Sequence, residues 1–367
     1  MSKIIIQNGN MCELDLPLKF AQKLYNEFAI RHPNAFYLRT RQRGMQNWDG
    51  KIHYITKTGQ FKIGLLPKVY DMCIEMGIKP KVVDMRQPLP KVSKVVTNIG
   101  KYKLRPEQEK AVKAVINNKI GNTPFHIGVL DYTVNAGKTL IMSSLYLSYK
   151  KQLKTLLITN DSDWLNQARE EFKQYLPGED ITFVQGKVLN WSNFTIGMVQ
   201  SISRNMRFYQ KELSQIDMVL IDEADQGGSK QYQNVITRLF NTRIRIGLSG
   251  TIYMSKLAKD KVKNMNLECF FGKVIAEFKL KDSIKKGYST KTIVKMVPGK
   301  PWYGNWESDC ISYKEIYDDS ITNSYTAWLM AYSRLRWNIN QGRYPALVVC
   351  KHIAHCENLY KFFKKKL

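Results

Sequence analysis

Short apolar runs alternate with amphipathic segments between residues 101 and 285, and this alternation predicts how that part of the chain folds. The apolar runs are HIGVL, TLLIT, FTIGMV, MVLI and IRIGL. After TLLIT the apolar positions follow a helical spacing, at Trp164, Leu165, Ala168, Phe172 and Tyr175. Short buried strands separated by helices are typical of a doubly wound parallel sheet. Residues 101–285 are therefore predicted to form an α/β lobe of this class.

Residues 1–95 show a different pattern. The range 16–28 has helical periodicity, whereas 37–41 and 51–56 look like strands on either side of the turn GMQNWDG. Within that turn, Asp49-Gly50 favours a hairpin. The following stretch, RQPLPKVSKVVTNIGKYKLRP, is rich in proline and lysine and is predicted to be a linker. We therefore expect a small α+β domain before the lobe.

The last part of the chain, 286–367, has a helical pattern around 312–340. An apolar run at 346–350 follows, and then a helix-like stretch with apolar residues at Ile353, Leu359, Phe362 and Phe363. One strand and one helix alone would expose apolar edges that a finished domain covers. We therefore expect 286–367 to be the start of a second α/β lobe whose remainder is missing.

The charge balance points to a polyanionic partner. Lys and Arg number 57 against 31 Asp and Glu, a net charge of +26. Such an excess attracts nucleic acid, although a lysine-rich surface can also reflect genome composition. No stretch approaches the ~20 apolar residues of a membrane span, and the short apolar run near residue 1 does not predict a secretory signal. The six cysteines form no C-x-x-C pair, which argues against a zinc site and favours reduced thiols. Reduced thiols indicate a cytoplasmic protein, in the host cytoplasm if a phage encodes the chain.

The segment YTVNAGKT, 132–139, lies between an apolar run and a helical pattern, where a phosphate-binding loop belongs. Gly137 would let the backbone approach a phosphate, Lys138 would supply a cation, and Thr139 would offer a hydroxyl to Mg²⁺. The full pattern has Gly at the position of Tyr132. A chance turn before a helix is the alternative interpretation.

The segment MVLIDEAD, 218–225, strengthens the prediction of an ATP site. A buried strand that ends in two acids places Asp222 at the carboxyl edge of the sheet, where it can hold Mg²⁺. Glu223 can orient or deprotonate the water that attacks the γ-phosphate. An acidic helix start is the alternative, but the two motifs occur in the expected order and strand context. ATP and Mg²⁺ are therefore the predicted cofactors.

These motifs resemble those of the superfamily 2 helicases, P-loop NTPases of the DEAD type with two RecA-like lobes. In YKLRPEQEKAV, Gln108 resembles the residue that reads the adenine edge. The implied ATP-binding set is Arg105, Gln108, Thr133, Val134, Asn135, Ala136, Gly137, Lys138 and Thr139. TLLITNDSDWLNQAREEF and IGMVQSIS are similar to DNA-contacting motifs, which implies contacts from Thr159, Asn160, Gln200 and Ser201. IGLSGT matches the element that couples ATP state to DNA, here Ser249, Gly250 and Thr251.

The N-terminal block narrows the resemblance to the UvsW-type phage helicases. NWDGKIHYI, preceded by Arg39, Arg41 and Arg43, resembles their accessory domain, and ALVVCKHIAH is similar to a strand of their second lobe. Alternating along a strand, the three arginines would share one face and contact DNA phosphates, with a solvated face as the alternative. Trp48 is predicted to pack within the core or the turn and not to stack on a base. The resemblance implies an ATP-dependent helicase that remodels branched DNA such as forks, junctions and R-loops, in replication, recombination or repair.

Two functional hypotheses follow. In the first, the sequence is part of such a helicase, whose second lobe supplies the arginines that stabilise phosphoryl transfer. In the second, the chain is an ATP-responsive DNA-binding module, completed where needed by a separate polypeptide. A restriction-type or RNA-directed motor is a further alternative. The segment NQGRYP (340–345) is predicted to be a loop, and His352 and His355 are predicted to be structural histidines.

Overall fold

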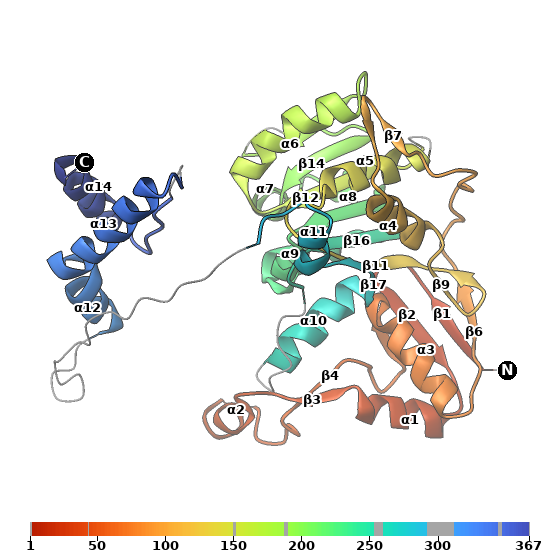
Figure 1. The fold of residues 1–367 in the computed structure, drawn as a ribbon. Helices are drawn as coiled ribbons and strands as arrows, with labels where there is room; N and C mark the ends of the chain where they lie inside the picture. Colours follow the sequence, from red (N-terminus) through yellow and green to blue (C-terminus); the bar gives the residue numbers. More distant parts are fainter. Residues whose placement is uncertain are drawn as a thin grey trace. The chain divides into compact units, whose positions relative to one another are not determined.

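The computed structural model describes residues 2–42, 44–149, 152–186, 190–252, 260–291, 312–343 and 347–366. Contacts divide the chain into two units, Met1–Lys291 and Thr292–Leu367. Figure 1 shows the first unit with a large and a small sheet and the second as a group of helices.

The centre of the first unit is a seven-stranded sheet in the order β13-β14-β12-β15-β16-β11-β17. All its neighbouring strands pair in parallel. The strands are β11 (His126–Tyr132), β12 (Thr155–Thr159), β13 (Ile181–Val184), β14 (Phe194–Met198), β15 (Met218–Asp222), β16 (Ile244–Ser249) and β17 (Val274–Phe278). The predicted α/β class is confirmed, and each of the five apolar runs within 101–285 forms one of these strands.

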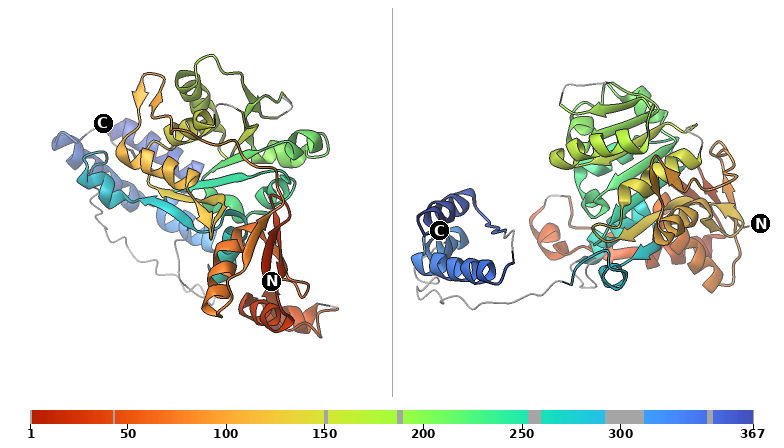
Figure 2. Two further views of the ribbon diagram at one scale, coloured as in Figure 1. Left: turned by 90° about the vertical axis from the view of Figure 1, so that its right-hand side faces the viewer. Right: turned by 45° about the horizontal axis from the view of Figure 1, so that its top comes forward.

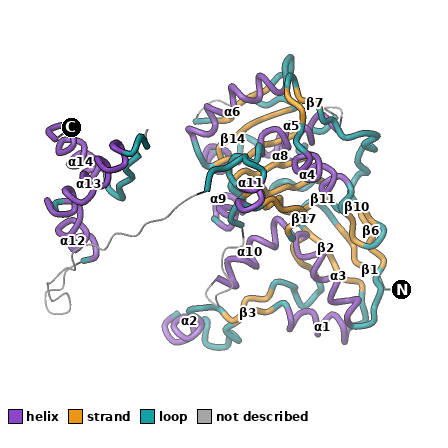
Figure 3. Tube along the Cα trace, in the orientation of Figure 1, coloured by secondary structure: helices purple, strands orange, loops and turns teal. Residues whose placement is uncertain are grey.

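Helices cover both faces of this sheet (Figures 2 and 3). One core contains residues of α4 (Pro106–Ile116), α5 (Lys138–Ser148) and α6 (Ser162–Tyr175). The other contains residues of α7 (Val199–Arg204), α8 (Gln210–Ser214), α9 (Lys230–Ile236) and α10 (Lys261–Phe271). Along β12, Leu157 belongs to the first core and Leu156 and Ile158 to the second. Because successive side chains of a strand point to opposite faces, a strand buried on both faces has a continuous apolar run.

The N-terminal block is built on a four-stranded sheet in the order β5-β2-β1-β6. Its elements are β1 (Lys3–Ile6), β2 (Met11–Asp15), α1 (Leu18–Glu27), β5 (Gln60–Lys62), η1 (Ile63–Leu65), α3 (Leu66–Glu75) and β6 (Lys81–Asp84). Short strand pairs accompany it: β3 (Ala29–Arg31) with β4 (Lys51–His53), β7 (Asn98–Ile99) with β8 (Tyr102–Lys103), and β9 (Lys119–Ile120) with β10 (Thr123–Pro124).

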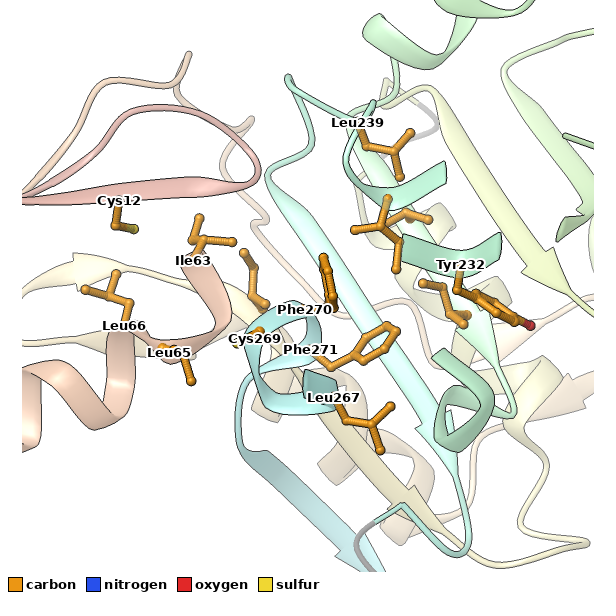
Figure 4. Packing of buried hydrophobic residues seen from close by; sticks show 14 of the residues in the cluster. Cys12, Ile63, Leu65, Leu66, Tyr232, Leu239, Leu267, Cys269, Phe270 and Phe271 are labelled. Carbon is orange, nitrogen blue, oxygen red and sulfur yellow. The ribbon is translucent and has the colours of Figure 1, made fainter. Parts of the chain in front are cut away.

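This block shares a hydrophobic core with the lobe. Figure 4 shows Ile63 and Leu65 beside Cys269 and Phe270 of α10, and all four side chains belong to one cluster. Arg245, a fully buried residue of β16, donates hydrogen bonds to the carbonyl oxygen of Gly9 at 2.6 Å, to Oδ1 of Asn10 at 2.8 Å and to the carbonyl oxygen of Phe270 at 3.1 Å. The block is therefore anchored on the lobe by apolar packing and by one buried guanidinium.

The predicted strand at 37–41 is wrong, because these residues belong to the helix α2 (Ala35–Arg41). The strand that pairs with β4 is β3, in antiparallel register, and Gly50 adopts the positive φ of 78° that the turn requires. The hairpin partner of β4 is thus β3, and 37–41 forms local helical bonds instead, such as Leu38 N to the carbonyl oxygen of Asn34. Positions two apart on a helix are about 200° apart, so Arg39 and Arg41 do not share a face.

The second unit contains α12 (Tyr313–Tyr317), the π-helical η4 (Asp318–Thr322), α13 (Tyr325–Asn340) and α14 (Ile353–Lys366). The predicted strand at 346–350 is wrong for its described part, since 347–350 has no regular secondary structure and Leu347 is 88% exposed. A parallel strand needs a partner, and the described residues of this unit include no strand. NQGRYP begins at the end of α13 and turns at Gly342, with φ 67°; 344 and 345 lie outside the described residues.

Candidate active site

The carboxyl ends of β11, β16 and β15 meet at one edge of the large sheet. These strands are neighbours and parallel, in the order β15-β16-β11. The loop 133–137 follows β11, Ser249 ends β16, and Asp222 ends β15. The topology therefore brings the three sequence motifs together where open α/β sheets bind ligands.

The loop before α5 has the backbone of a phosphate cradle. Asn135 and Gly137 adopt positive φ values of 64° and 74°. A Cβ atom on Gly137 would collide with Nε2 of Gln108, so only glycine fits there without displacing Gln108. Lys138 and Thr139 form the first turn of α5, whose free amide groups and dipole favour an anion at this end.

Lys138 is held by the two acids. Its Nζ lies 3.3 Å from Oδ1 of Asp222 and 3.1 Å from Oε1 of Glu223. Burial opposes the charge of Lys138, but the two carboxylates outweigh it, so the pKa of Lys138 is raised above its ordinary value. The side chain of Asp222 is 5% exposed and that of Glu223 46%, so Asp222 depends on this cation far more than Glu223 does.

The acids differ in backbone as well as in burial. Glu223 is one of two described non-glycine residues with a positive φ, at 49°. Such strain is concentrated at functional sites. Oδ1 of Asp222 is buried and makes no hydrogen bond among the described residues. Beside the acids is a hollow of about 380 Å³ that is lined by the loop and by one side of α6, with Trp164, Gln167, Glu171 and Tyr175. The sequence interpretation assigned Trp164 and Tyr175 to packing and gave Gln167 and Glu171 no role of their own.

The predicted base-reading residues are bound to the loop. Gln108 is buried, accepts a hydrogen bond from the backbone N of Arg105 at 2.8 Å and donates one to the carbonyl oxygen of Ala136 at 2.8 Å. Arg105 donates from Nη2 to the carbonyl oxygen of Asn135 at 3.2 Å. Tyr132, where the usual pattern has glycine, is fully buried and donates its hydroxyl to the carbonyl oxygen of Glu107 at 2.8 Å. The start of α4 and the loop therefore form one connected structure.

The predicted coupling residues lie next to both motifs. Oγ of Ser249 donates to Oδ1 of Asp225 at 3.1 Å and accepts from the backbone N of Thr251 at 3.2 Å. A Cβ on Gly250 would lie 3.2 Å from Cα of Thr133, so this turn contacts the start of the loop. Residues 253–259 lie outside the described part.

The predicted DNA-contacting residues fall into two groups. At the adjacent ends of β12 and β14, Gln200 donates from Nε2 to the carbonyl oxygen of Asn160 at 3.2 Å. Nearby, Oγ1 of Thr159 accepts from Asp161 N, and Oγ of Ser201 accepts from Gly186 N. Arg39 and Arg41 belong to α2, at the opposite end of the first unit from α6 (Figure 1), and Arg43 lies outside the described residues. The structure thus brings together the first group only.

Other chemistry is sparse in the described part of the chain. No group of three or more metal-ligating side chains occurs there, and no described helix is long and apolar enough to cross a membrane. Trp48 donates its Nε1 hydrogen to the carbonyl oxygen of Lys51 at 2.9 Å, a contact of turn packing. His352 lies with its ring centroid 5.0 Å from that of Tyr317.

Residues 101–254 match the family model described as "Type III restriction enzyme, res subunit". The chain is 21% identical over 347 residues to the ATP-dependent DNA helicase uvsW of Enterobacteria phage T4, an alignment that covers 87% of this chain and 65% of that protein. A crystal structure of the UvsW helicase from bacteriophage T4 matches with a TM-score of 0.58 at 21% identity, covering 76% of this chain and 99% of that chain. A second T4 UvsW structure matches with a TM-score of 0.58 at 19% identity, over 100% of this chain and 73% of that chain. At these identities the solved structures show a shared fold.

Proposed function

We propose that this chain belongs to the superfamily 2 helicases and carries the ATP-binding lobe of an ATP-driven DNA motor. The observation that carries the proposal is the position of Lys138 within 3.3 Å of both Asp222 and Glu223, at the sheet edge and behind a loop with two positive φ angles. A cation, two acids and a cradle of backbone amides are the parts that phosphoryl transfer from a nucleotide requires.

In this proposal the loop amides and the start of α5 bind the phosphates of ATP, and Lys138 turns from the acids toward the β- and γ-phosphates. Asp222 and the hydroxyl of Thr139 would hold Mg²⁺, and the hydrogen-bond-free, buried Oδ1 of Asp222 suits that role. When bound, Mg²⁺ neutralises charge on the phosphate oxygens. Glu223, half exposed beside the hollow, is placed to orient a water molecule or accept its proton.

DNA contact is proposed at the same edge of the sheet. Asn160 and Gln200 are partly exposed at the ends of β12 and β14, where their polar groups can bind backbone phosphates. Thr159 and Ser201 are buried beside them and would support this contact through their hydrogen bonds to the backbone. Ser249 contacts Asp225, which lies two residues after Glu223, so this pair is the proposed route between ATP and DNA. The net charge of +26 supports a nucleic-acid partner.

The substrate and the activity of the whole protein are also part of what we propose. The chain spans 65% of the length of the curated relative it matches. We propose branched DNA as the substrate, with α2 as a second contact area, where Arg39 lines a hollow of about 520 Å³ together with Arg31 and Lys51. The alternative is an ATP-responsive DNA-binding module that does not turn over without a further polypeptide.

Binding of MgATP to the full chain tests the ATP-binding lobe. Lys138→Ala should abolish binding, because the site loses its phosphate cation, while Lys110→Ala, a matched change at an exposed position of α4, should leave it unchanged. Equal ATP affinity in the two variants would contradict the proposal.

The branched-DNA part needs a test that keeps the fold, since the N-terminal block shares its core with the lobe. Arg39→Ala with Arg41→Ala should weaken binding to a four-way junction more than binding to single-stranded DNA. The control is Lys19→Ala with Lys23→Ala, which removes the same charge from the exposed side of α1. Equal losses on the two DNA substrates would argue against α2 as a junction contact.

A further inference from the structure

The segment Lys279–Ser289, which follows β17 and contains α11 (Leu280–Lys285), returns to the start of α4. We call this segment the clasp. Lys279 at its beginning forms an ion pair with Asp131 at the end of β11. Near its end, Lys286 and Tyr288 reach Glu107 and Arg105. The clasp therefore contacts the predicted base-reading motif and not the phosphate cation.

Glu107 is the polar centre of this contact. Its side chain is 6% exposed, and its Oε2 accepts a hydrogen bond from Nζ of Lys286 at 2.6 Å. Its Oε1 lies 3.3 Å from Nε of Arg105, with no hydrogen bond. A buried carboxylate requires such cations nearby, because desolvation disfavours its charge. Lys286 thus holds the Glu107 carboxylate in place, and the Arg105 guanidinium lies beside that carboxylate.

A row of aromatic rings completes the contact. Cζ of Arg105 lies 4.3 Å from the ring centroid of Tyr288. The Tyr288 centroid is 6.4 Å from that of Phe278, which is 6.0 Å from that of Tyr132. Tyr132 in turn donates its hydroxyl to the backbone of Glu107. Tyr132, the residue that departs from the usual phosphate-loop pattern, is therefore the buried first member of the row of rings that ends at Arg105.

The guanidinium of Arg105 makes one described hydrogen bond, from Nη2 to the carbonyl oxygen of Asn135. That bond alone leaves the plane of the group free to rotate, whereas a ring against one face fixes it. The side chain is still 27% exposed and can meet a ligand. We propose that Tyr288 is a positioning residue for base recognition: it orients Arg105 against the purine base of ATP, and Lys286 supports this through Glu107. This inference rests on the proposed ATP site.

According to this inference, different residues recognise the base and the phosphates of ATP. Tyr288 and Lys286 act on Arg105 and Glu107, whereas the phosphate site consists of Lys138, Thr139 and the loop amides. Loss of the clasp contacts should therefore weaken a ligand that carries a base and spare one that does not. Inorganic tripolyphosphate with Mg²⁺ is the base-free probe.

The experiment measures dissociation constants of the full chain for MgATP and for magnesium tripolyphosphate. Tyr288→Ala should weaken ATP binding by about five- to tenfold, the size of one cation–π contact, and change tripolyphosphate binding by less than about twofold. Tyr288→Phe keeps the ring and should bind ATP like the wild type. Lys286→Ala should weaken ATP binding, but Lys285→Ala should not, since Lys285 makes no ion pair among the described residues.

Equal weakening of both ligands by Tyr288→Ala, or no change in either, would overturn the inference. If the wild type binds tripolyphosphate as tightly as ATP, base recognition fails while the phosphate site stands. If the folded wild type binds neither ligand, the proposed function itself fails.

Discussion

The replacement Lys138→Ala, the obvious test of the ATP site, should also destabilise the nucleotide-free protein. The change removes the cation that lies 3.3 Å from Asp222, whose side chain is 5% exposed. The carboxylate is then left buried with no described positive partner within ion-pair distance. Glu223 is 46% exposed and keeps its hydration, so it contributes little to the effect.

The structure sets the size of this effect. Removing one partner of a buried ion pair costs about 3–5 kcal/mol, because the remaining charge is desolvated without compensation. Since the Lys138 side chain keeps 15% exposure, we take the lower end, about 3 kcal/mol. The unit that carries the site spans Met1–Lys291, so its unfolding entropy is about 0.6 kcal/mol/K and each kcal/mol lowers Tm by about 1.6 °C. Lys138→Ala should therefore lower Tm by about 5 °C.

The control that isolates the charge is a second replacement. Asp222→Asn, added to Lys138→Ala, removes the orphaned carboxylate and should restore most of the lost Tm. Lys110→Ala, at an exposed position, should leave Tm unchanged. Thermal unfolding at pH 7.5 without nucleotide is the assay. If Lys138→Ala alone shifts Tm by less than about 2 °C, the buried ion pair contributes little and the reasoning is refuted.

The pH dependence provides an independent check. The pKa of Lys138 is raised above its ordinary value of 10.5 in the folded protein. The ion pair therefore contributes its full stability below about pH 10.5 and loses it as the pH rises through the raised pKa. The stability difference between wild type and Lys138→Ala should be constant around neutral pH and narrow in strong alkali.

The remaining predictions concern the core and the DNA contacts. Gly64→Ala places a Cβ against the carbonyl oxygens of Glu268 and Cys269 and should cost more than about 2 kcal/mol in denaturant unfolding, whereas Gly228→Ala, whose Cβ would lie 3.7 Å from Leu267, is the tolerated control. Burial lowers the pKa of His126, so the folded protein should lose stability as the pH falls below 6.5, and His126→Gln should flatten that part of the pH profile. If α2 contacts phosphates, Arg39→Ala with Arg41→Ala should reduce the salt slope of DNA binding by up to about two, and an unchanged slope would exclude those contacts.

The five inner strands of the large sheet could be predicted because they are buried on both faces, whereas the edge strands β13 and β17 are only partly buried and were not predicted. β12 and β15 have continuous apolar runs, and their following motifs lie at the same sheet edge through parallel topology alone. The segment 37–41 could not be predicted correctly, because the local sequence does not show which segment pairs with β4. That pairing joins β3 and β4 across a stretch of chain that contains α2 itself.

The motifs of the site could be predicted from the sequence, but the contacts that hold these motifs in place could not. The phosphate loop and the pair of acids are each a short continuous motif in the sequence. The contact of Lys286 with Glu107, in contrast, joins residues 179 positions apart. Nothing local to Tyr132 or Tyr288 distinguishes them from ordinary buried or surface aromatic residues. Only the fold shows that Phe278 links them.

The measurement that tests the central claim most directly is MgATP binding by the full chain, compared with the variant that combines Lys138→Ala and Asp222→Asn. This variant should fold with nearly wild-type stability, so a loss of binding reports on the site and not on the fold. The account predicts that the wild type binds MgATP and the double variant does not. Equal binding by both proteins, or no binding by a folded wild type, would contradict the assignment of this lobe as an ATP site.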